Sequence, residues 1–481
     1  MQWTRRNLTR RQFLAAGGAA AAATCLAGRR GAAAEGDAPS LRAGAATVDI
    51  TPGKDVRLDG PIMRIGPVRE VLDPLHVRAL VLDDGQTRLA FAVCDATIIS
   101  REIFDKAKAL VQQRIGLAPA NMLMSATHTH MAVRAASLGL GEGNDRYEAA
   151  LSGKIAEAVV AAAGRLAPAR VGWGAVDVPR FAHNRRWIMK PGTVGPNPFG
   201  ETGEQVVMGG RPAENRVKNA GPIDPELSVL SVQHADGRPL AVLGNYGIHY
   251  VAFKGGAVSA DYFGYFARRI EELLCPDDGE PPFVGMMTNG TSGDVGSPGG
   301  GLEGIKDVGY ALAEEAARVV RAIEHQGDVS LAARCSELEL GVRRPSPERI
   351  AWARAVQAGT WNQPAHGWKK IYAHNTLRLA ESPPTLSVPL QAVRIGSLGI
   401  AASPCEVFAA TGLALKGESP LKPTFHVELA NGYSGYLPPP DQFALGGYTT
   451  WPAESSCLEI DAEPKIRAEL LRLLRAVKEE G

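Results

Sequence analysis

Short apolar runs alternate along the chain with longer stretches in which apolar residues recur at helical spacing. Three runs have the length of buried strands, at residues 88–94, 121–126 and 240–246. Five stretches have one apolar face, as amphipathic helices do, at residues 103–115, 145–166, 262–274, 305–323 and 464–480. This alternation predicts an α/β fold in which a layered mixed sheet is flanked by helices.

Two segments interrupt the alternation. Residues 190–224 are rich in Gly, Pro and Asn and are too long for an ordinary connection, so we predict a functional loop or lid there. Residues 344–384 are predicted to hold a helix followed by Trp361 and Trp368 among prolines, as an insertion over one face. Neither segment has the composition of an interdomain linker. Residues 35–481 are therefore predicted to form one domain.

The first 34 residues have the features of an export signal. Arg10 and Arg11 lie in T-R-R-Q-F-L, an uncharged alanine-rich run follows, and an A-x-A sequence ends at Ala34. The hexamer is similar to a twin-arginine signal, so we predict a periplasmic or secreted protein that is cleaved near Ala34. One alternative is a membrane anchor, but the run is shorter than the ~20 apolar residues of a span. The second alternative is processing as a lipoprotein at Cys25.

The charge balance argues against a nucleic-acid partner. The chain has 52 basic and 51 acidic residues, and six of the arginines lie in the signal segment. Without those six, 46 basic residues face 51 acidic ones, a net charge of −5. A mildly acidic body has no positive field for a phosphate backbone. Apart from Cys25, five widely spaced cysteines without a C-x-x-C motif indicate mostly buried thiols, not a disulfide framework.

The first chemical signal is S-A-T-H-T-H at residues 125–130, directly after a predicted strand. In an extended backbone His128 and His130 point to the same side, because side chains alternate with period two. Two imidazoles at one strand end can serve one metal ion, or one can bind the metal while the other works beside it. A hydrogen-bonded structural pair is the alternative.

Two further loops also follow apolar strands. His249 closes N-Y-G-I-H at 245–249, and Asp261 is expected either to orient that imidazole or to cap the next helix. Asp294 lies in a glycine-rich turn at 289–296, where a carboxylate can act as a general base for a metal-bound water. The alternative is a simple turn. It lacks the Walker A spacing, so no phosphate-binding loop is predicted.

The C-terminal third adds a carboxylate and several phenols. Glu406, in S-P-C-E, is expected at the start of a helix, a position that favours a carboxylate in any case. Tyr436, in N-G-Y-S-G-Y, and Tyr448 are surrounded by small residues. Such surroundings indicate phenols at a surface or cleft instead of a core.

In this order the motifs resemble the neutral/alkaline (non-lysosomal) ceramidase family over nearly all of residues 44–460. The resemblance rests on S-A-T-H-T-H, the later strand-end histidine, N-x-x-x-G-D-V, P-x-E and N-x-Y-x-x-Y. It implies one zinc ion per chain, with the ligands His128, His249, Glu406 and Tyr436. It also implies catalytic roles for Asp294, His130 and Tyr448, with Asp294 as the base, and contacts of Arg185 with substrate or oxyanion.

The sequence also departs from the ceramide-cleaving members, which have G-D-[VM]-S-P-N. Gly296 occupies the serine position, and Ser297, displaced by one residue, is assigned to substrate binding. Met131 follows T-H-T-H where those members have Ser-Gly-Pro, and the chain ends soon after Tyr448, where they continue into an immunoglobulin-like domain. These departures leave the metal ligands in place, but ceramide specificity does not follow from the resemblance.

The leading hypothesis is an exported zinc-dependent hydrolase that cleaves the N-acyl (amide) bond of ceramide or a related N-acyl lipid. The first alternative keeps the zinc site but takes a more polar amide, ester or sugar-derived substrate. The second is a non-catalytic periplasmic binding protein. The predicted partner is a small molecule or lipid, with no membrane-spanning segment in the mature chain. Another divalent ion is the alternative to zinc, and the oligomeric state stays open.

Overall fold

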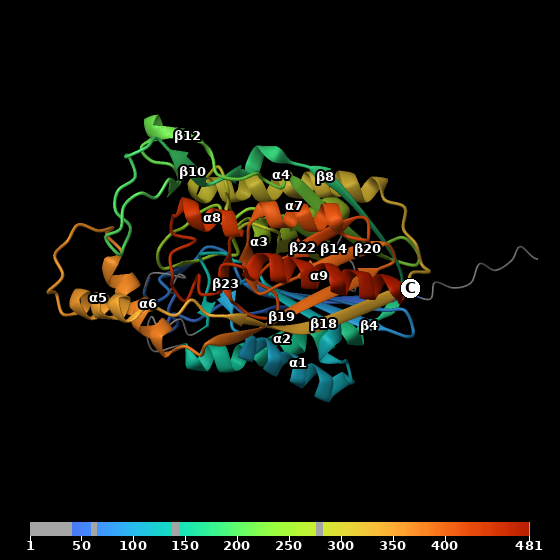
Figure 1. The fold of residues 1–481 in the computed structure, drawn as a ribbon. Helices are drawn as coiled ribbons and strands as arrows, with labels where there is room; N and C mark the ends of the chain where they lie inside the picture. Colours follow the sequence, from blue (N-terminus) through green and yellow to red (C-terminus); the bar gives the residue numbers. More distant parts are fainter. Residues whose placement is uncertain (1–40, 59–64, 137–143, 276–281, 481) are drawn as a thin grey trace, which may run out of the picture. The chain divides into compact units, whose positions relative to one another are not determined.

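An eight-stranded mixed β-sheet organises the protein, here a computed structural model that describes residues 41–58, 65–136, 144–275 and 282–480 (Figure 1). The strand order is β16-β14-β13-β8-β1-β3-β4-β6. The strands are β1 (Arg42–Asp49), β3 (His76–Asp83), β4 (Arg88–Cys94), β6 (Met122–Ala126), β8 (Ala167–Asp177), β13 (Glu226–His234), β14 (Pro239–Tyr246) and β16 (Val284–Asn289). The predicted export signal, including Cys25, lies outside the described residues.

The two halves of this sheet are built in the same way, although the sequence shows no repeat. In each half an antiparallel hairpin leads into a parallel strand–helix–strand unit: β3, β4, α1, β6 on one side and β13, β14, α3, β16 on the other. A second helix follows each unit. The four helices are α1 (Arg101–Ile115), α2 (Asp145–Gly164), α3 (Asp261–Leu274) and α4 (Gly301–Ala322). The predicted α/β layering is confirmed.

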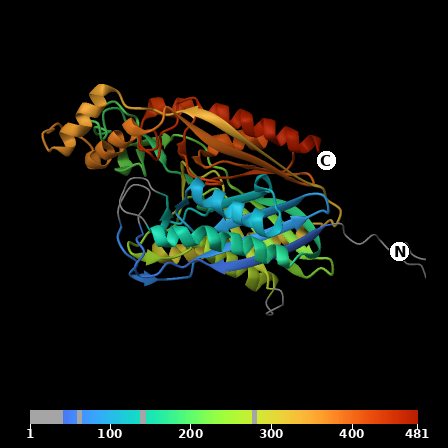
Figure 2. The same ribbon diagram turned by 90° about the horizontal axis from the view of Figure 1, so that it is seen from below.

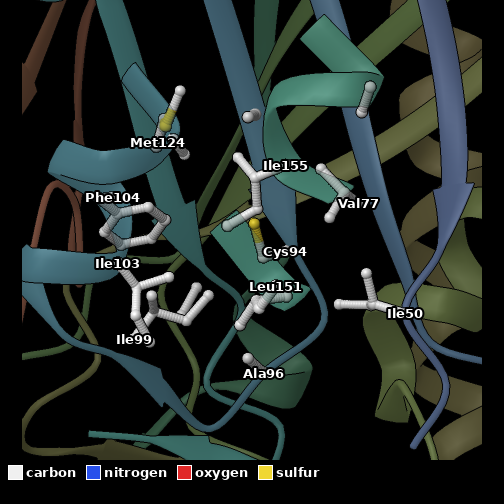
Figure 3. Close-up of a cluster of buried hydrophobic side chains, with 14 of the residues drawn as sticks. Ile50, Val77, Cys94, Ala96, Ile99, Ile103, Phe104, Met124, Leu151 and Ile155 are labelled. Atoms are coloured by element: carbon white, nitrogen blue, oxygen red, sulfur yellow. The ribbon is translucent and has the colours of Figure 1, made fainter. Parts of the chain in front are cut away.

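Helices cover one face of the sheet. α1 and α2 lie side by side over the β1-β3-β4-β6 half (Figure 2). Every second residue of a strand points to this face, so Val77 meets Phe104 of α1 and Ile155 of α2 in one buried cluster (Figure 3). α3 and α4 bury their apolar stripes in the same way over the other half, where Phe266 and Leu312 pack against Val242.

The opposite face of the large sheet packs on a second, four-stranded sheet. Phe91 and Leu243 of the large sheet share one buried core with Val393 and Phe425 of the small one. The small sheet has the order β18 (Leu331–Gly341), β19 (Thr385–Ile395), β20 (Leu398–Ala402) and β22 (Thr424–Val427). Its outer face is covered by α9 (Ala462–Glu479), which Figure 1 shows running along β18 and β19, and by α7 (Ala409–Glu418).

Short two-stranded ribbons join the loops at the ends of these strands. They are β2 (Glu70–Val71) with β15 (Ala257–Val258), β5 (Ile98–Ile99) with β7 (Arg134–Ala135), β9 (His183–Asn184) with β17 (Val295–Gly296), and β21 (Cys405–Val407) with β23 (Gly435–Leu437). The β21–β23 ribbon holds Glu406 and Tyr436, and the β9–β17 ribbon is flanked by Arg185 and Asp294, all four of which the sequence assigns to the site. Each ribbon pairs segments more than twenty residues apart, which no local pattern reveals.

The two segments that interrupt the alternation are more ordered than predicted. Within 190–224, β11 (Val206–Met208) and β12 (Arg216–Asn219) both pair with β10 (Arg186–Met189), so the predicted loop contains a small sheet. Residues 344–384 form two helices instead of one, α5 (Pro347–Gln357) and α6 (Lys369–Glu381), which pack on each other. A short helix α8 (Pro440–Leu445) follows β23. The buried face of α6 includes the polar Thr376, which weakened its apolar pattern.

No disulfide joins the five cysteines among the described residues, and Cys94, Cys405 and Cys457 are buried, as the sequence predicts for most of them. Within the described ranges, no helix combines the length and apolar character that a bilayer crossing requires.

Candidate metal centre

The imidazoles of His128 and His130 converge just after β6. Their Nε2 atoms are 3.2 Å apart, and His128 is fully buried. The predicted cause of this convergence is wrong. β6 ends at Ala126, and His128 adopts a left-handed backbone with φ of 69°. Only a tight turn brings side chains two residues apart this close, and a non-glycine residue there is strained. Such strain in a buried polar loop is typical of a functional site.

His249 completes a group of three histidines. It follows β14, and its Nε2 lies 3.1 Å from Nε2 of His128. One nitrogen from each of His128, His130 and His249 lies within 4.8 Å of the others, a spacing that suits a metal ion. His128 and His249 are buried, whereas His130 is partly exposed and stacks on Tyr250 at 3.9 Å. His130 is therefore the member of the group that faces an approaching molecule.

Glu406 brings a carboxylate to the same group. Its Oε2 lies 3.3 Å from Nε2 of His128 and 3.6 Å from Nε2 of His249. The residue lies in β21 and not at the helix start expected from sequence, because α7 begins only at Ala409. Oε1 accepts a hydrogen bond of 2.9 Å from the Tyr433 hydroxyl, while the buried Oε2 has no hydrogen-bond donor.

The protonation of the two buried imidazoles decides what these atoms can bind. Nδ1 of His128 is 2.7 Å from the Thr97 carbonyl, and Nδ1 of His249 is 3.2 Å from the Ser292 carbonyl. Since a carbonyl only accepts, both Nδ1 atoms carry a proton, which leaves both Nε2 atoms facing the centre of the group. Burial opposes a charge on His128, but the charge of Glu406 outweighs it and raises the pKa of His128, so the metal-free group favours a second proton on that imidazole. A metal cation between the three atoms would take the place of that proton as the positive charge that a buried carboxylate requires.

The spacing of these donors fits zinc. Ligand atoms about 2.0–2.1 Å from a tetrahedral zinc ion lie roughly 3.3–3.5 Å from one another. The measured separations among His128, His249 and Glu406 are 3.1, 3.3 and 3.6 Å. Two imidazoles and a carboxylate form a donor set typical of catalytic zinc, which keeps a position open for substrate or water.

Burial and neighbouring charges set the pKa values in the group. Burial, together with the nearby cations, lowers the pKa of His130 and of His249 well below the ordinary value, so both imidazoles are neutral at pH 7. Burial opposes the charge of Glu406, but His128 and a hydrogen bond from Tyr436 outweigh it, and the pKa of Glu406 is lowered. A metal ion therefore meets an ionised carboxylate, and it competes with the proton that Glu406 favours on His128.

The phenols predicted from sequence lie beside Glu406. β21 and β23 pair in parallel with Glu406 opposite Tyr436, so their side chains leave the ribbon as neighbours. The hydroxyl of Tyr436 is 2.6 Å from that of Tyr448 and accepts a bond of 3.3 Å from Nη2 of Arg185. The same guanidinium nitrogen donates to the Gly293 carbonyl at 2.8 Å. The structure thus brings Arg185, Tyr436 and Tyr448 together as one cluster of donors.

The structure does not bring Asp294 into the histidine group. Its Oδ2 accepts a 2.7 Å bond from Nδ2 of Asn184, and its Oδ1 accepts a 2.8 Å bond from the backbone of Ala409 at the start of α7. Its own carbonyl accepts from the backbone of Arg185 at 2.8 Å. Burial raises the pKa of Asp294. In this arrangement Asp294 holds the Arg185 loop and α7 in place.

Ser297 lies one step away from the group. Its hydroxyl donates a 3.2 Å bond to the carbonyl of Tyr250, the residue that stacks on His130. Gly296 pairs with His183 in the β9–β17 ribbon, and a Cβ at Gly296 would approach Nε2 of His183 to 3.2 Å. Ser297 therefore supports Tyr250, which stacks on His130. Gly296 packs closely against the neighbouring strand β9.

Asp261 does not orient His249. Its carboxylate accepts from the backbones of Val251, Ala252 and Tyr262, so it stabilises the turn after His249 and the first turn of α3. The sequence left two roles open for Asp261, orienting His249 or capping the next helix, and the structure favours the role at the helix start. The partner of the His249 imidazole is Ser292.

Glu428 is the residue near the group that sequence reasoning missed. It is wholly buried and accepts bonds from the Ser292 hydroxyl at 2.5 Å, the Ser292 backbone at 3.2 Å and the Val407 backbone at 3.0 Å. The Ser292 hydroxyl in turn lies 3.3 Å from Nδ1 of His249. One carboxylate thus ties the support of His249 to the strand of Glu406. The only signal in the sequence is a glutamate directly after a short apolar strand.

Comparison with known proteins shows the same fold in two ceramidase structures. The crystal structure of neutral ceramidase from Pseudomonas aeruginosa matches with a TM-score of 0.67 and 17% identity, over 92% of this chain and 75% of that chain. A ceramidase complexed with C2 matches with a TM-score of 0.68 and 17% identity, over 92% and 76%. No family model and no curated protein matches the sequence. The resemblance drawn from the motifs is confirmed for the fold.

Proposed function

We propose that this protein is a zinc-dependent hydrolase that cleaves the amide bond of an N-acyl substrate. The observation that supports the proposal most strongly is the buried convergence of Nε2 of His128, Nε2 of His249 and Oε2 of Glu406, an oxygen that accepts no hydrogen bond. The fold that the chain shares with the ceramidase structures supports amide cleavage as the reaction. Zinc supplies a Lewis acid that polarises the carbonyl and lowers the pKa of a water molecule from about 15.7 to about 7.

The phenol and guanidinium cluster stabilises the negative charge that develops on the carbonyl oxygen. Arg185 and Tyr436 are held together by a hydrogen bond, and Tyr448 lies beside them. Preorganised donors at this position cost no reorganisation during the reaction, which makes them effective in a site shielded from water. Tyr436 also lies next to Glu406, so its phenol oxygen is placed to act as the fourth zinc ligand that the family resemblance implies.

His130 is the residue we assign to proton transfer. It is neutral, partly exposed and adjacent to the buried ligands. It takes the proton from water as the oxygen attacks the carbonyl carbon, and it returns the proton to the amine as the carbon–nitrogen bond breaks. Asp294, the base implied by the family resemblance, already accepts two hydrogen bonds and acts here by fixing the loop that carries Arg185.

Removal of a ligand tests this proposal. His128→Ala and Glu406→Ala should each abolish both bound zinc and the hydrolysis of a labelled ceramide, whereas His325→Ala, outside the group, should leave both intact. Metal content is measured by mass spectrometry and fatty-acid release by chromatography. Full zinc and full turnover in either ligand variant would refute the proposal. Zinc binding without release of fatty acid in the unaltered protein would move the search to the more polar amides.

We also propose export through the twin-arginine signal at residues 1–34, which rests on the sequence. Replacement of Arg10 and Arg11 by lysine should retain the protein in the cytoplasm, as cell fractionation would show. Unchanged periplasmic delivery would contradict this assignment.

A further inference from the structure

A cavity of about 340 Å³ adjoins the metal centre, and the two segments that interrupt the alternation form it. One wall comes from residues 193–211, and the other from His366 and Trp368 ahead of α6. Tyr448 and Trp451 close it on the side of the metal centre. The Tyr448 hydroxyl bonds to that of Tyr436, which neighbours Glu406, so this pair of phenols connects the cavity to the metal centre.

The size of this Trp368 cavity limits what it can hold. Pockets for small ligands span roughly 300–1,000 Å³, so about 340 Å³ lies at the small end of that range. One compact group fits, whereas two long hydrocarbon chains do not. Trp368 and Tyr448 meet edge to face with ring centroids 6.1 Å apart, and the rings of His366 and Trp451 are tilted to each other at 5.5 Å. Flat aromatic faces suit a flat or chair-shaped ring.

The polar groups of the cavity include both donors and acceptors. The Trp368 backbone donates to Nδ1 of His366, so Nε2 of that imidazole carries a proton to donate. Arg211 adds a guanidinium. Glu204 accepts from Nε1 of Trp451 at 2.7 Å, from the Gly447 backbone at 2.9 Å and from Asn197 at 3.0 Å, and the carboxylate keeps further acceptor capacity.

These polar groups decide between a hydrocarbon and a hydroxylated ligand. A hydrocarbon chain would desolvate Glu204, Arg211 and His366 without replacing their bonds to water, which is costly. Hydroxyl groups both donate and accept, so they match a lining that offers both. We infer that the Trp368 cavity binds a hydroxylated ring of monosaccharide size. If the protein is the amide hydrolase proposed above, on which this step rests, the ring belongs to the substrate and lies beyond its scissile amide.

Binding of methyl β-D-glucopyranoside tests the inference, because this probe has the ring but no amide to cleave. Titration calorimetry on the zinc-loaded protein should detect binding, and 1-heptanol, a hydrocarbon probe, should bind more weakly. Trp368→Ala should weaken glucoside binding by about tenfold, the value of one good aromatic contact. Gly195→Phe should abolish it, because Gly195 lines the cavity and has open space at its Cβ.

Trp361→Ala is the matched control, since Trp361 belongs to the same insertion but packs on Trp352 and Gly200 outside the cavity. It should leave glucoside binding unchanged. Tighter binding of 1-heptanol than of the glucoside, or no glucoside binding, would overturn the inference even if the protein hydrolyses amides. Glucoside binding that depends on Trp368 would uphold the cavity assignment, and if no amide were cleaved only the proposed function would fail.

Discussion

At the scale of single residues, the support of His249 is the most informative feature of the metal centre. Its Nδ1 faces the carbonyl and hydroxyl of Ser292, and that hydroxyl donates to the buried carboxylate of Glu428. Metal-binding histidines usually donate their second ring nitrogen to such a partner, which fixes the tautomer and raises the basicity of the ligand. In the proposed metal centre Glu428 is therefore a positioning residue, which would act on a bound metal through Ser292 and His249.

Glu428→Gln should weaken zinc binding by about 10- to 100-fold, the usual cost of losing a carboxylate behind a ligating histidine. Competition with a chromophoric chelator measures the zinc Kd. Glu418→Gln is the matched control, because Glu418 lies on the surface in α7 and pairs with Arg467. Equal zinc affinities for Glu428→Gln and the unaltered protein would show that Ser292 orients His249 without help.

The pH dependence of stability should also report Glu428. Burial raises its pKa from 4.5 to about 8, so the folded metal-free protein holds a proton that the unfolded chain has released. Stability should therefore fall as pH rises from about 4.5 to about 8, by up to about 1.4 kcal/mol per pH unit from this group. Urea unfolding at several pH values gives the free energy of unfolding as a function of pH, and this free energy should change less with pH in Glu428→Gln. An equal change with pH in both proteins would assign the dependence to other groups.

The sequence singled out His128, His130 and His249 because each is a chemically distinctive side chain after an apolar run, whereas the roles of Glu406 and Tyr436 came from the family resemblance. It missed Glu428, since a lone glutamate after a short strand has no local signature. Its importance comes from Ser292, which is 136 residues away in the chain. Contacts of this kind depend on the tertiary fold alone.

At the scale of elements, the β21–β23 ribbon places Glu406 beside Tyr436. Gly435, which begins β23, has a φ of 77°, and a Cβ there would lie 2.5 Å from the backbone of Ser455. Only glycine fits such a position. Gly435→Ala should therefore lower the free energy of unfolding by about 1–3 kcal/mol and displace Tyr436.

Chemical denaturation measures this effect, and Gly417→Ala is its matched control. Gly417 lies in α7 with nothing near its Cβ, so an alanine there should stabilise the helix by about 0.5–1 kcal/mol. A Gly435→Ala variant as stable as the unaltered protein would contradict the close approach of β23 to Ser455.

Periodicity identified the long elements but not the short ones. The strand at 88–94 and the helices on the large sheet were predicted from their apolar spacing, which reflects one buried face. The two-residue and three-residue ribbons have no period of their own. The backbone at His128 was predicted to be extended, but it is left-handed. A histidine gives no sequence signal for this conformation, which accompanies the tertiary contact of its ring with the Thr97 carbonyl.

At the scale of the whole molecule, the site lies where the two similar halves of the large sheet meet the small sheet. His128 follows a strand of one half, His249 follows a strand of the other, and Glu406 follows β20 of the small sheet. The layered α/β architecture was predicted from the alternation of elements. The meeting of three strand ends was implied only by the family resemblance, because strand order is not visible in a single sequence.

A ligand that links three parts of the fold should stabilise all of it. Free zinc at 100 times its Kd should add about 2.7 kcal/mol to the free energy of unfolding, provided that zinc binds the folded state alone. Calorimetry with and without a chelator should thus show a lower Tm for the metal-free protein. His128→Ala should unfold at the same Tm with and without zinc. A zinc-dependent Tm in that variant would place the metal elsewhere.

The measurement that tests the central claim most directly is a zinc titration of the metal-free protein during hydrolysis of an N-acyl amide. Activity should rise linearly with added zinc and reach its plateau at one equivalent per chain. In parallel, Glu406→Ala should stay inactive throughout the titration. Activity that is already full without zinc, or that rises equally in Glu406→Ala, would contradict a catalytic metal centre built by His128, His249 and Glu406.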